Sequence, residues 1–247
     1  MTSPRLATLT EFTAQLPEIE TVNEVISGLD AVMNAFDIRF YVIVRHPAFS
    51  RDLIGQVLAG RWPDGWPERY IAKNYVLVDP IVRYMGRSQV GFNWADAILA
   101  YHSDPDYSRM QRMMLDAFKH GLEGGYAFPI HGRGGLVGNM SLSGRAAELK
   151  TNELQAFDTL AKYAFWRLQE LAGSDEGRPS YTDPHLTVRE KQILAFLGDG
   201  LTSNEIASEL ELSRHTVDWH MGSLQEKLQA KNRHHTIAIA FRLGLIS

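Results

Sequence analysis

A group of aromatic residues followed by a carboxylate is the first feature of this sequence that could do chemistry. Trp62, Trp66, Tyr70 and Tyr75 precede Asp79 in the segment RWPDGWPERYIAKNYVLVDPIV. Indole N–H groups donate hydrogen bonds to carbonyl oxygens, and a carboxylate accepts them from an amide N–H. Aromatic rings supply the apolar walls of many small-molecule pockets. Together these residues would suit a small amphipathic ligand.

The same residues also have a purely structural interpretation. They would form a partly buried aromatic cluster, and the Asp79–Pro80 pair would only begin a turn. A methionine-rich stretch further along the chain has a similar ambiguity. It would line a tunnel for an acyl chain, because methionine adapts to flexible ligands, or it would pack in an ordinary core. Its residues are Met110, Met113, Met114 and Phe118.

A second polar surface is predicted in the segment LTSNEIASELELSRHTVDWHMGSLQEKL, residues 201–228. Val217, Met221, Leu224 and Leu228 follow spacings of four, three and four, which is typical of one apolar stripe on a helix. The rest of this helix carries side chains that can form hydrogen bonds. They are Arg214, His215, Thr216, Trp219, His220, Ser223 and Lys227. Such a helix has a buried back and a front suited to reading base edges.

Local start signals predict four helices between residues 186 and 247. Thr187 with Glu190, and Thr202 with Glu205, fit capping boxes, and Ser213 fits the N-cap of the third helix. A short helix, a tight turn and a polar-fronted helix are typical of a helix-turn-helix, whose second helix enters the major groove of DNA.

Basic residues beyond the polar-fronted helix would meet phosphate oxygens. Lys231 and Arg233 follow Lys227 at the end of the third helix and the start of the fourth. The alternative is a small bundle of amphipathic helices that does not bind DNA. The segment carries seven Lys or Arg and seven Asp or Glu, so its net charge alone does not favour DNA.

The N-terminal part shows mixed helix and strand patterns. Residues 10–35 and 107–120 have helical periodicity, and a long helix is expected around Leu154–Leu171. Residues 38–46 are rich in strand-forming types, and two further runs flank a GRGG turn at 132–135. Helices before and after strands joined by a hairpin indicate an antiparallel sheet flanked by helices.

The composition and one Gly- and Pro-rich segment limit the possible domain organisation and the possible classes of protein. The chain has 247 residues, 45% hydrophobic, with no Cys and a net charge of -4. The absence of Cys excludes disulfides, Cys-based zinc sites and thiol nucleophiles. A Gly, Pro, Ser and charge-rich stretch at 173–185 indicates a linker, so we expect domains at 1–172 and 186–247. The polar N-terminus and the lack of long apolar windows favour a cytoplasmic protein with no membrane segment.

Both parts resemble one family. LTVREKQIL, GLTSNEIASEL, LSRHTVDWHM and LQEKL resemble the LuxR-type helix-turn-helix, in which Glu190 matches a signature position with a structural role. The resemblance makes the helix at 214–228 the recognition helix. The pattern of Trp66, Tyr70, Asp79 and Trp94 resembles the acyl-homoserine-lactone-binding domain of quorum-sensing LuxR regulators.

That resemblance implies a fold and roles for the pocket residues. It implies an α+β chain: an N-terminal α/β/α sandwich with a five-stranded antiparallel sheet, and a C-terminal all-α domain of four helices. Trp66 would donate to the lactone carbonyl and Asp79 would accept from the ligand amide. Tyr70 and Trp94 would wall the pocket. Trp62 stands where many members have a tyrosine that binds the acyl carbonyl.

The resulting hypothesis is a ligand-responsive transcriptional regulator, not an enzyme. Its partners would be an N-acyl-homoserine lactone, double-stranded DNA, a second copy of the chain in a homodimer, and RNA polymerase. No cofactor and no metal are expected. The alternative is a LuxR-type DNA-binding regulator that is ligand-independent or senses a different small molecule.

Overall fold

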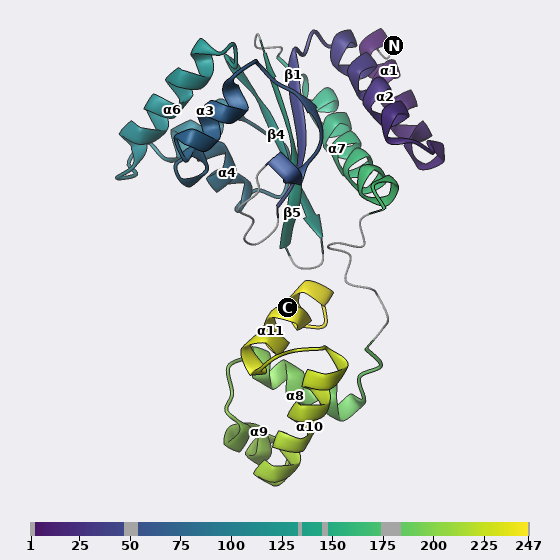
Figure 1. The fold of residues 1–247 in the computed structure, drawn as a ribbon, viewed down its shortest axis with the longest axis vertical. Coiled ribbons are helices and arrows are strands. Elements are labelled where there is room, and N and C mark those ends of the chain that lie inside the picture. The colour runs from purple at the N-terminus through teal and green to yellow at the C-terminus, as the bar shows by residue number, and fades with distance from the viewer. Residues whose placement is uncertain (1–2, 47–53, 133–134, 145–147, 174–183, 247) are drawn as a thin grey trace. The chain divides into compact units, whose positions relative to one another are not determined.

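The computed structural model describes residues 3–46, 54–132, 135–144, 148–173 and 184–246 (Figure 1). The chain divides into two compact units, and the division along the chain falls between residues 174 and 175. The predicted linker at 173–185 lies outside the described residues except at its ends. Among the described helices, none is both long and apolar enough to cross a membrane.

The N-terminal unit is built on a five-stranded antiparallel sheet, as expected. Its strand order is β2-β1-β5-β4-β3. The strands are β1 Phe40–Arg45, β2 Val57–Arg61, β3 Phe92–Asn93, β4 Gly124–Gly132 and β5 Gly135–Gly144. β4 and β5 are neighbours in sequence and in the sheet, as a hairpin requires. The hairpin turn itself, at residues 133–134, lies outside the described residues.

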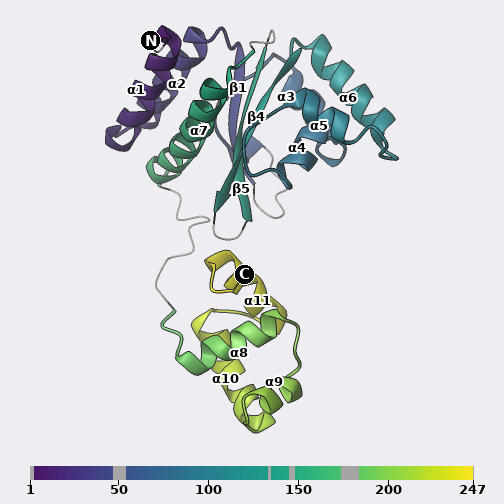
Figure 2. The same cartoon turned by 180° about the vertical axis from the view of Figure 1, so that it is seen from behind.

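Three helices cover one face of the sheet (Figures 1 and 2). They are α1 Pro4–Gln15, α2 Val22–Ala35 and α7 Thr151–Leu171. The helical periodicity expected over residues 10–35 is divided between the end of α1 and the whole of α2. A 3-10 turn, η1 Leu16–Glu18, breaks it, and a capping box of Thr21 and Glu24 starts α2. Proline inside the turn and a new N-cap three residues later explain the break.

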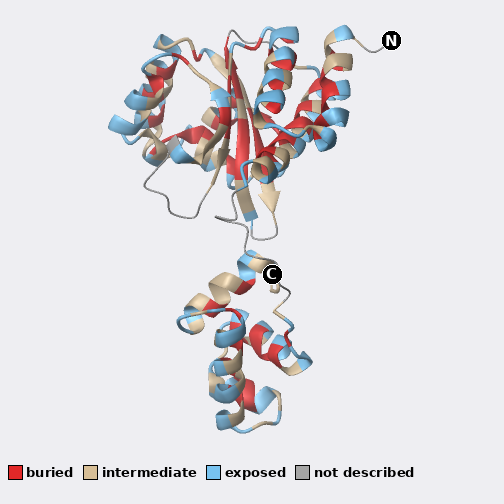
Figure 3. Ribbon diagram, turned by 45° about the vertical axis from the view of Figure 1, so that its right-hand side comes forward, coloured by how far each residue is buried: buried red, intermediate tan, exposed pale blue. Residues whose placement is uncertain are grey.

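The main core lies between these helices and the sheet (Figure 3). Ile43 and Met140 pair across β1 and β5, and both are fully buried. The face of α7 that carries Phe157, Ala161, Phe165 and Leu168 is also buried here, so it belongs to the core. Near the start of α7, Glu153 accepts two hydrogen bonds from Arg5, at 2.8 and 2.7 Å, which ties α7 to α1.

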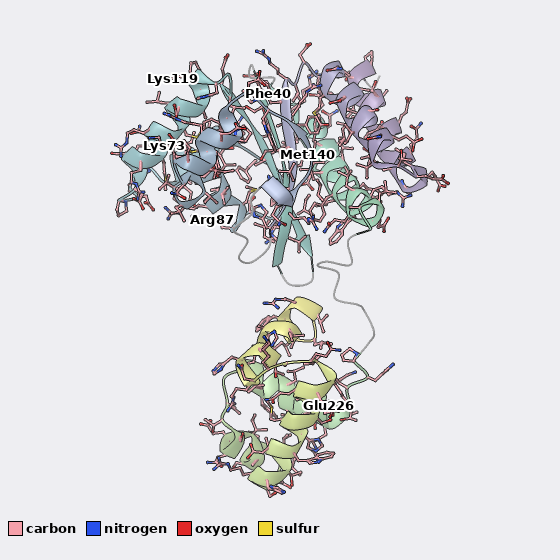
Figure 4. All side chains as sticks on the ribbon, viewed as in Figure 1. Phe40, Lys73, Arg87, Lys119, Met140 and Glu226 are labelled. Carbon is pink, nitrogen blue, oxygen red and sulfur yellow. The ribbon has the colours of Figure 1, made fainter. Side chains whose placement is uncertain are left out.

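The other face of the sheet carries a second layer of shorter helices (Figures 1 and 2). They are α3 Trp66–Ala72, η3 Tyr75–Leu77, α4 Pro80–Met85, α5 Trp94–Ala100 and α6 Tyr107–Lys119, and a short turn, η2 Ile54–Gln56, precedes β2. Phe40 packs against this layer, whereas Met140 belongs to the main core; both are labelled in Figure 4. The α6 helix confirms the methionine-rich helix expected at 107–120.

The C-terminal unit contains four helices, as predicted. They are α8 Val188–Gly198, α9 Ser203–Glu209, α10 Arg214–Lys227 and α11 Arg233–Leu243. Both predicted capping boxes and the Ser213 N-cap are present. The apolar stripe of α10 is buried in a small core of its own: Val217, Met221, Leu224 and Leu228 all lie in it. Between α9 and α10 the chain turns through Glu211 with φ +53°.

Candidate functional site

The aromatic residues of the N-terminal unit gather around Trp66. The α3 helix begins at this residue because Gly65 adopts a left-handed conformation, φ +75°, and Pro67 occupies the first turn. The Trp66 ring centroid lies 5.9 Å from that of Tyr70, 6.0 Å from Tyr75 and 5.3 Å from His120. These contacts bring together side chains from α3, η3 and the end of α6.

Asp79 is buried beside this cluster, and no described cationic side chain is paired with it. Its Oδ2 accepts from the Tyr70 hydroxyl at 2.9 Å. Its Oδ1 accepts from the backbone N–H groups of Ile81 and Val82, at 2.8 and 3.3 Å, so it caps α4. Burial raises the pKa of Asp79, and the three hydrogen bonds only partly oppose that rise. The carboxylate is thus held in place by neutral donors in an apolar setting.

The structure brings four of the five predicted pocket residues into one buried cluster. Trp66, Trp94 and the partly buried Tyr70 belong to it, and Asp79 is bonded to Tyr70. Trp62 is half-buried and is not part of this cluster. Trp94 also lines a cavity of about 300 Å³, whereas Trp66, Tyr70 and Asp79 are not in the lining of that cavity.

A salt bridge that the sequence did not reveal anchors the cluster. Asp116 on α6 accepts from Arg69 Nε at 2.6 Å and from the Tyr75 hydroxyl at 2.7 Å. The Arg69 guanidinium and the Tyr75 hydroxyl lower the pKa of Asp116. Arg69 and Asp116 are 47 residues apart, so no local spacing could have paired them. The contact fixes α3 and η3 against α6.

The methionine-rich helix divides between core and surface. Met110 and Met113 are buried, and Met113 packs in the cluster that contains Trp66. Met114 is half-buried and lines the cavity beside Trp94. Phe118 is exposed. Met114 also packs against that cluster, so ordinary core packing accounts for all three methionines but not for the exposed Phe118.

The front of α10 presents polar and aromatic side chains to solvent. Arg214, His215 and Trp219 are exposed, and Trp219 shows 65% of its surface. Arg214 lies 3.5 Å from Asp218 one turn later. Thr216 and His220 are half-buried at the edge of this face.

Two residues predicted on the shoulder of that front instead bind inward. Ser223 Oγ donates to Glu190 Oε1 at 2.6 Å, and Lys227 Nζ donates to Glu190 Oε2 at 2.7 Å. Burial alone would raise the pKa of Glu190, but donors from Lys227, Ser223 and Thr187 outweigh it and lower the pKa to about 2. These bonds lock α10 to the start of α8.

The predicted basic residues beyond α10 differ in position. Lys231 is exposed, whereas Arg233 is half-buried and donates to the Leu201 carbonyl at 3.1 Å. Arg233 thereby joins the start of α11 to the turn before α9. In the described part of the chain, no group of His, Asp and Glu side chains has the arrangement of a metal site.

The sequence matches two known families, one in each unit. The autoinducer binding domain family covers residues 21–168. The family of bacterial regulatory proteins of the luxR type covers residues 184–240. The first match contains the buried aromatic cluster with Asp79, and the second contains α8, α9 and α10.

Curated relatives and solved structures agree with these matches. The transcriptional activator protein BjaR1 of Bradyrhizobium diazoefficiens is 28% identical over 96% of this chain and 95% of its own. The quorum sensing-dependent regulator RpaR of Rhodopseudomonas palustris is 30% identical over 90% of this chain and 88% of its own. The structure of SdiA in complex with octanoyl-rac-glycerol has a TM-score of 0.66 at 25% identity, and the match covers 99% of this chain and 98% of that one. SdiA is a regulatory protein of Escherichia coli.

Proposed function

This chain belongs to the luxR family of transcriptional regulators with an autoinducer-binding domain, and from that premise we propose that it binds an N-acyl-homoserine lactone in residues 1–172. We propose further that it binds operator DNA as a homodimer through residues 186–247. The family is one of quorum-sensing, DNA-binding regulators and not of enzymes.

The observation that carries the ligand proposal is the buried carboxylate among indoles and phenols. Asp79 has only neutral donors, so it retains acceptor capacity for a ligand amide N–H. Trp66 would donate from its indole to the lactone carbonyl. Tyr70 and Trp94 would wall the ring, and Trp62, which is half-buried outside this cluster, would face the acyl part.

The ligand proposal is tested by replacing Trp66 with Phe and measuring lactone binding. The substitution keeps the ring but leaves a buried carbonyl unpaired, so affinity should fall by about 1–3 kcal/mol. Isothermal titration of the purified protein with a series of N-acyl-homoserine lactones measures it. An unchanged lactone affinity in this variant would show that Trp66 does not bind the ligand.

The DNA proposal rests on the exposed front of α10. Arg214, His215, Thr216 and Trp219 would reach base edges, with His220 at the side. Lys231 is free to meet phosphate, whereas Ser223, Lys227 and Arg233 would contribute from positions in which they also hold the fold. Two such helices in a homodimer would reach half-sites about one DNA turn apart. RNA polymerase is the further partner that activation at a promoter would require.

Gel-shift titrations at graded salt test the DNA proposal. Phosphate contacts make the affinity for DNA fall steeply as the salt concentration rises. A Lys231→Ala variant should therefore reduce the slope of log affinity against log salt by about 1 per bound site. The companion variant is Trp219→Ala. It should weaken specific DNA binding and leave the slope of affinity against salt unchanged. Lack of duplex binding at low salt would favour a helical bundle that docks protein.

A second candidate is a regulator that folds without ligand or answers to a different small molecule. The buried packing of Trp66, Tyr70 and Asp79 with one another favours it, because a closed cluster does not need a ligand to complete it. Soluble, folded protein expressed without lactone, with operator binding unaffected by added lactone, would support this candidate over the first.

A further inference from the structure

A groove of about 550 Å³ runs along α6, which lies at the outer edge of the layer of shorter helices (Figures 1 and 2). Two large apolar side chains of this helix line the groove and face solvent: Leu115 is 62% exposed, and Phe118, one turn later, is 56% exposed. Large apolar side chains that gather in one exposed place mark an interaction surface. The exposed residues of the lining are together called the α6 surface, and they are Ser108, Gln111, Arg112, Leu115, Phe118 and Glu123.

Polar side chains border the apolar centre of the α6 surface. Ser108, Gln111 and Arg112 lie in the first half of α6, and Glu123 lies beyond the end of the helix. An apolar centre with a polar and charged border is the usual anatomy of a contact between two proteins. The α6 surface therefore fits another folded protein surface.

The two ends of the α6 surface carry opposite charges. Arg112 and Glu123 are exposed, and neither has an ion-pair partner within the part of the chain that the structure describes. Leu115 and Phe118 lie between them along the chain, near the midpoint. A two-fold axis through this apolar centre would therefore place Arg112 of each copy opposite Glu123 of the other.

This charge pattern makes the α6 surface complementary to itself. In a symmetric dimer the same patch of both copies forms the contact, so each residue must suit the residue that the axis places against it. Antiparallel packing of two α6 helices pairs apolar with apolar and cation with carboxylate. Parallel packing would instead bring Arg112 against Arg112 and Glu123 against Glu123, and such like-charge contacts disfavour an interface.

We propose that the α6 surface is a contact between two copies of this chain, in which the two α6 helices pack antiparallel. Leu115 and Phe118 of both copies form the apolar centre of the contact, and two pairs of Arg112 with Glu123 flank it. The inference rests on the homodimer of the proposed function, and it places one contact of that dimer in the N-terminal unit.

The first test measures dimerisation of the full-length protein by sedimentation equilibrium. Leu115→Glu and Phe118→Glu each place a charge in the apolar centre, so each should weaken the dimer about tenfold or more. Leu99→Glu is the matched control, since Leu99 is 69% exposed on α5 and does not line the groove, and it should leave dimerisation unchanged. Equal effects of all three substitutions, or no effect of any, would overturn the inference.

Charge reversal tests the antiparallel orientation. Arg112→Glu or Glu123→Arg alone puts like charges opposite each other at both ends of the contact, so each should weaken the dimer several-fold. The double variant reverses both charges and should restore dimerisation. Single variants that weaken the dimer without recovery in the double variant would contradict the proposed pairing.

Cysteine cross-linking tests the contact directly, because the chain has no Cys of its own. A chain with both Arg112→Cys and Glu123→Cys should form disulfide-linked dimers on oxidation, whereas either substitution alone should give none. Within one chain the two positions are on the order of 16 Å apart at the helical rise, which is too far for a disulfide between them. Absence of the cross-link in the double variant would overturn the inference.

The outcomes separate this contact from the proposed function. If Trp166→Glu, at an exposed position on α7, gives monomers while the α6 variants stay dimeric, the α6 contact fails and the homodimer stands. If the cross-link forms in a chain that binds neither N-dodecanoyl-homoserine lactone nor a random-sequence duplex, the contact stands and the proposed function fails. A wild type that stays monomeric with that lactone bound overturns the contact and leaves lactone binding intact.

Discussion

Asp79 in the N-terminal unit and Glu190 in the C-terminal unit are buried carboxylates near helix starts, but their pKa values are shifted in opposite directions. In the N-terminal unit burial raises the pKa of Asp79, whose partners among the described residues are a phenol and two backbone N–H groups. In the C-terminal unit the pKa of Glu190 is lowered to about 2, because an ammonium and two hydroxyl-bearing residues outweigh the effect of its burial.

This difference separates a carboxylate paired within the chain from one that we propose serves a ligand. Glu190 is paired inside the C-terminal unit with Lys227 and Ser223. Asp79 lies beside an apolar cluster that contains Trp94, whose indole N–H has no partner among the described residues. On the proposed function, ligand binding in the N-terminal unit would add to its stability.

The largest expected effect comes from removing the buried carboxylate of Glu190. Glu190→Ala leaves Lys227 and Ser223 without their buried partner and removes a helix cap. Removing one partner of a buried ion pair costs about 3–5 kcal/mol, and the partial exposure of Lys227 reduces this to about 2–3 kcal/mol. Calorimetric unfolding of the full chain measures it. Glu205→Ala, an exposed capping-box control, should destabilise the chain much less; equal losses in both variants would show that the buried ion pair of Glu190 adds nothing to stability.

The next prediction tests whether Asp79 is kept for binding. Asp79→Asn retains a capping oxygen but replaces half of the acceptor with a donor. Lactone affinity should fall by about 1–3 kcal/mol, while the free energy of unfolding without ligand changes by less than about 1 kcal/mol. Titration calorimetry and thermal unfolding of the same sample give both numbers. A variant that unfolds readily but binds normally would reverse the assignment.

In a pH series, the contributions of Glu190 and Asp79 to stability should change in opposite directions as the pH rises. The folded pKa of Glu190, about 2, lies below its ordinary 4.5, so its stabilisation is present above pH 4.5 and is lost as pH falls toward 2. The pKa of Asp79 is raised above 3.8, so its contribution declines as pH rises through the range just above that value. Calorimetry of wild type, Glu190→Gln and Asp79→Asn across this range isolates each slope. If the free energy of unfolding changed with pH in the same way in all three proteins, neither pKa shift would contribute to stability.

The smallest expected effect concerns the turn between α9 and α10. Glu211 has φ +53°, a left-handed conformation that costs a side chain about 1–2 kcal/mol and glycine almost nothing. Glu211→Gly should therefore raise the stability of the C-terminal unit by about 1 kcal/mol. Glu209→Gly, in the last turn of α9, is the control and should lower stability by about 0.5–1 kcal/mol. Thermal unfolding would refute the prediction if both glycines destabilised the chain alike.

Local signals in the sequence determined much of the architecture. The capping boxes at Thr187 and Thr202, the Ser213 N-cap and the apolar stripe of α10 are all present, because each depends on residues within one or two helical turns. The five-stranded sheet followed from the family resemblance. The missed break between α1 and α2 had a local cause, Pro17 and the Thr21 cap, that periodicity alone did not weigh.

The candidate sites were less accessible to sequence reasoning. Residue types selected Trp62, Trp66, Tyr70 and Asp79, and the family resemblance added Trp94; the structure places these together except for Trp62. Only the tertiary structure decided that Ser223 and Lys227 turn toward Glu190, that Arg69 holds Asp116, and that a cavity opens beside Trp94. These contacts join residues 33–47 positions apart or depend on how separate helices pack. A sequence fixes which groups a helix presents, whereas the partner of a buried charge depends on which distant element folds against it.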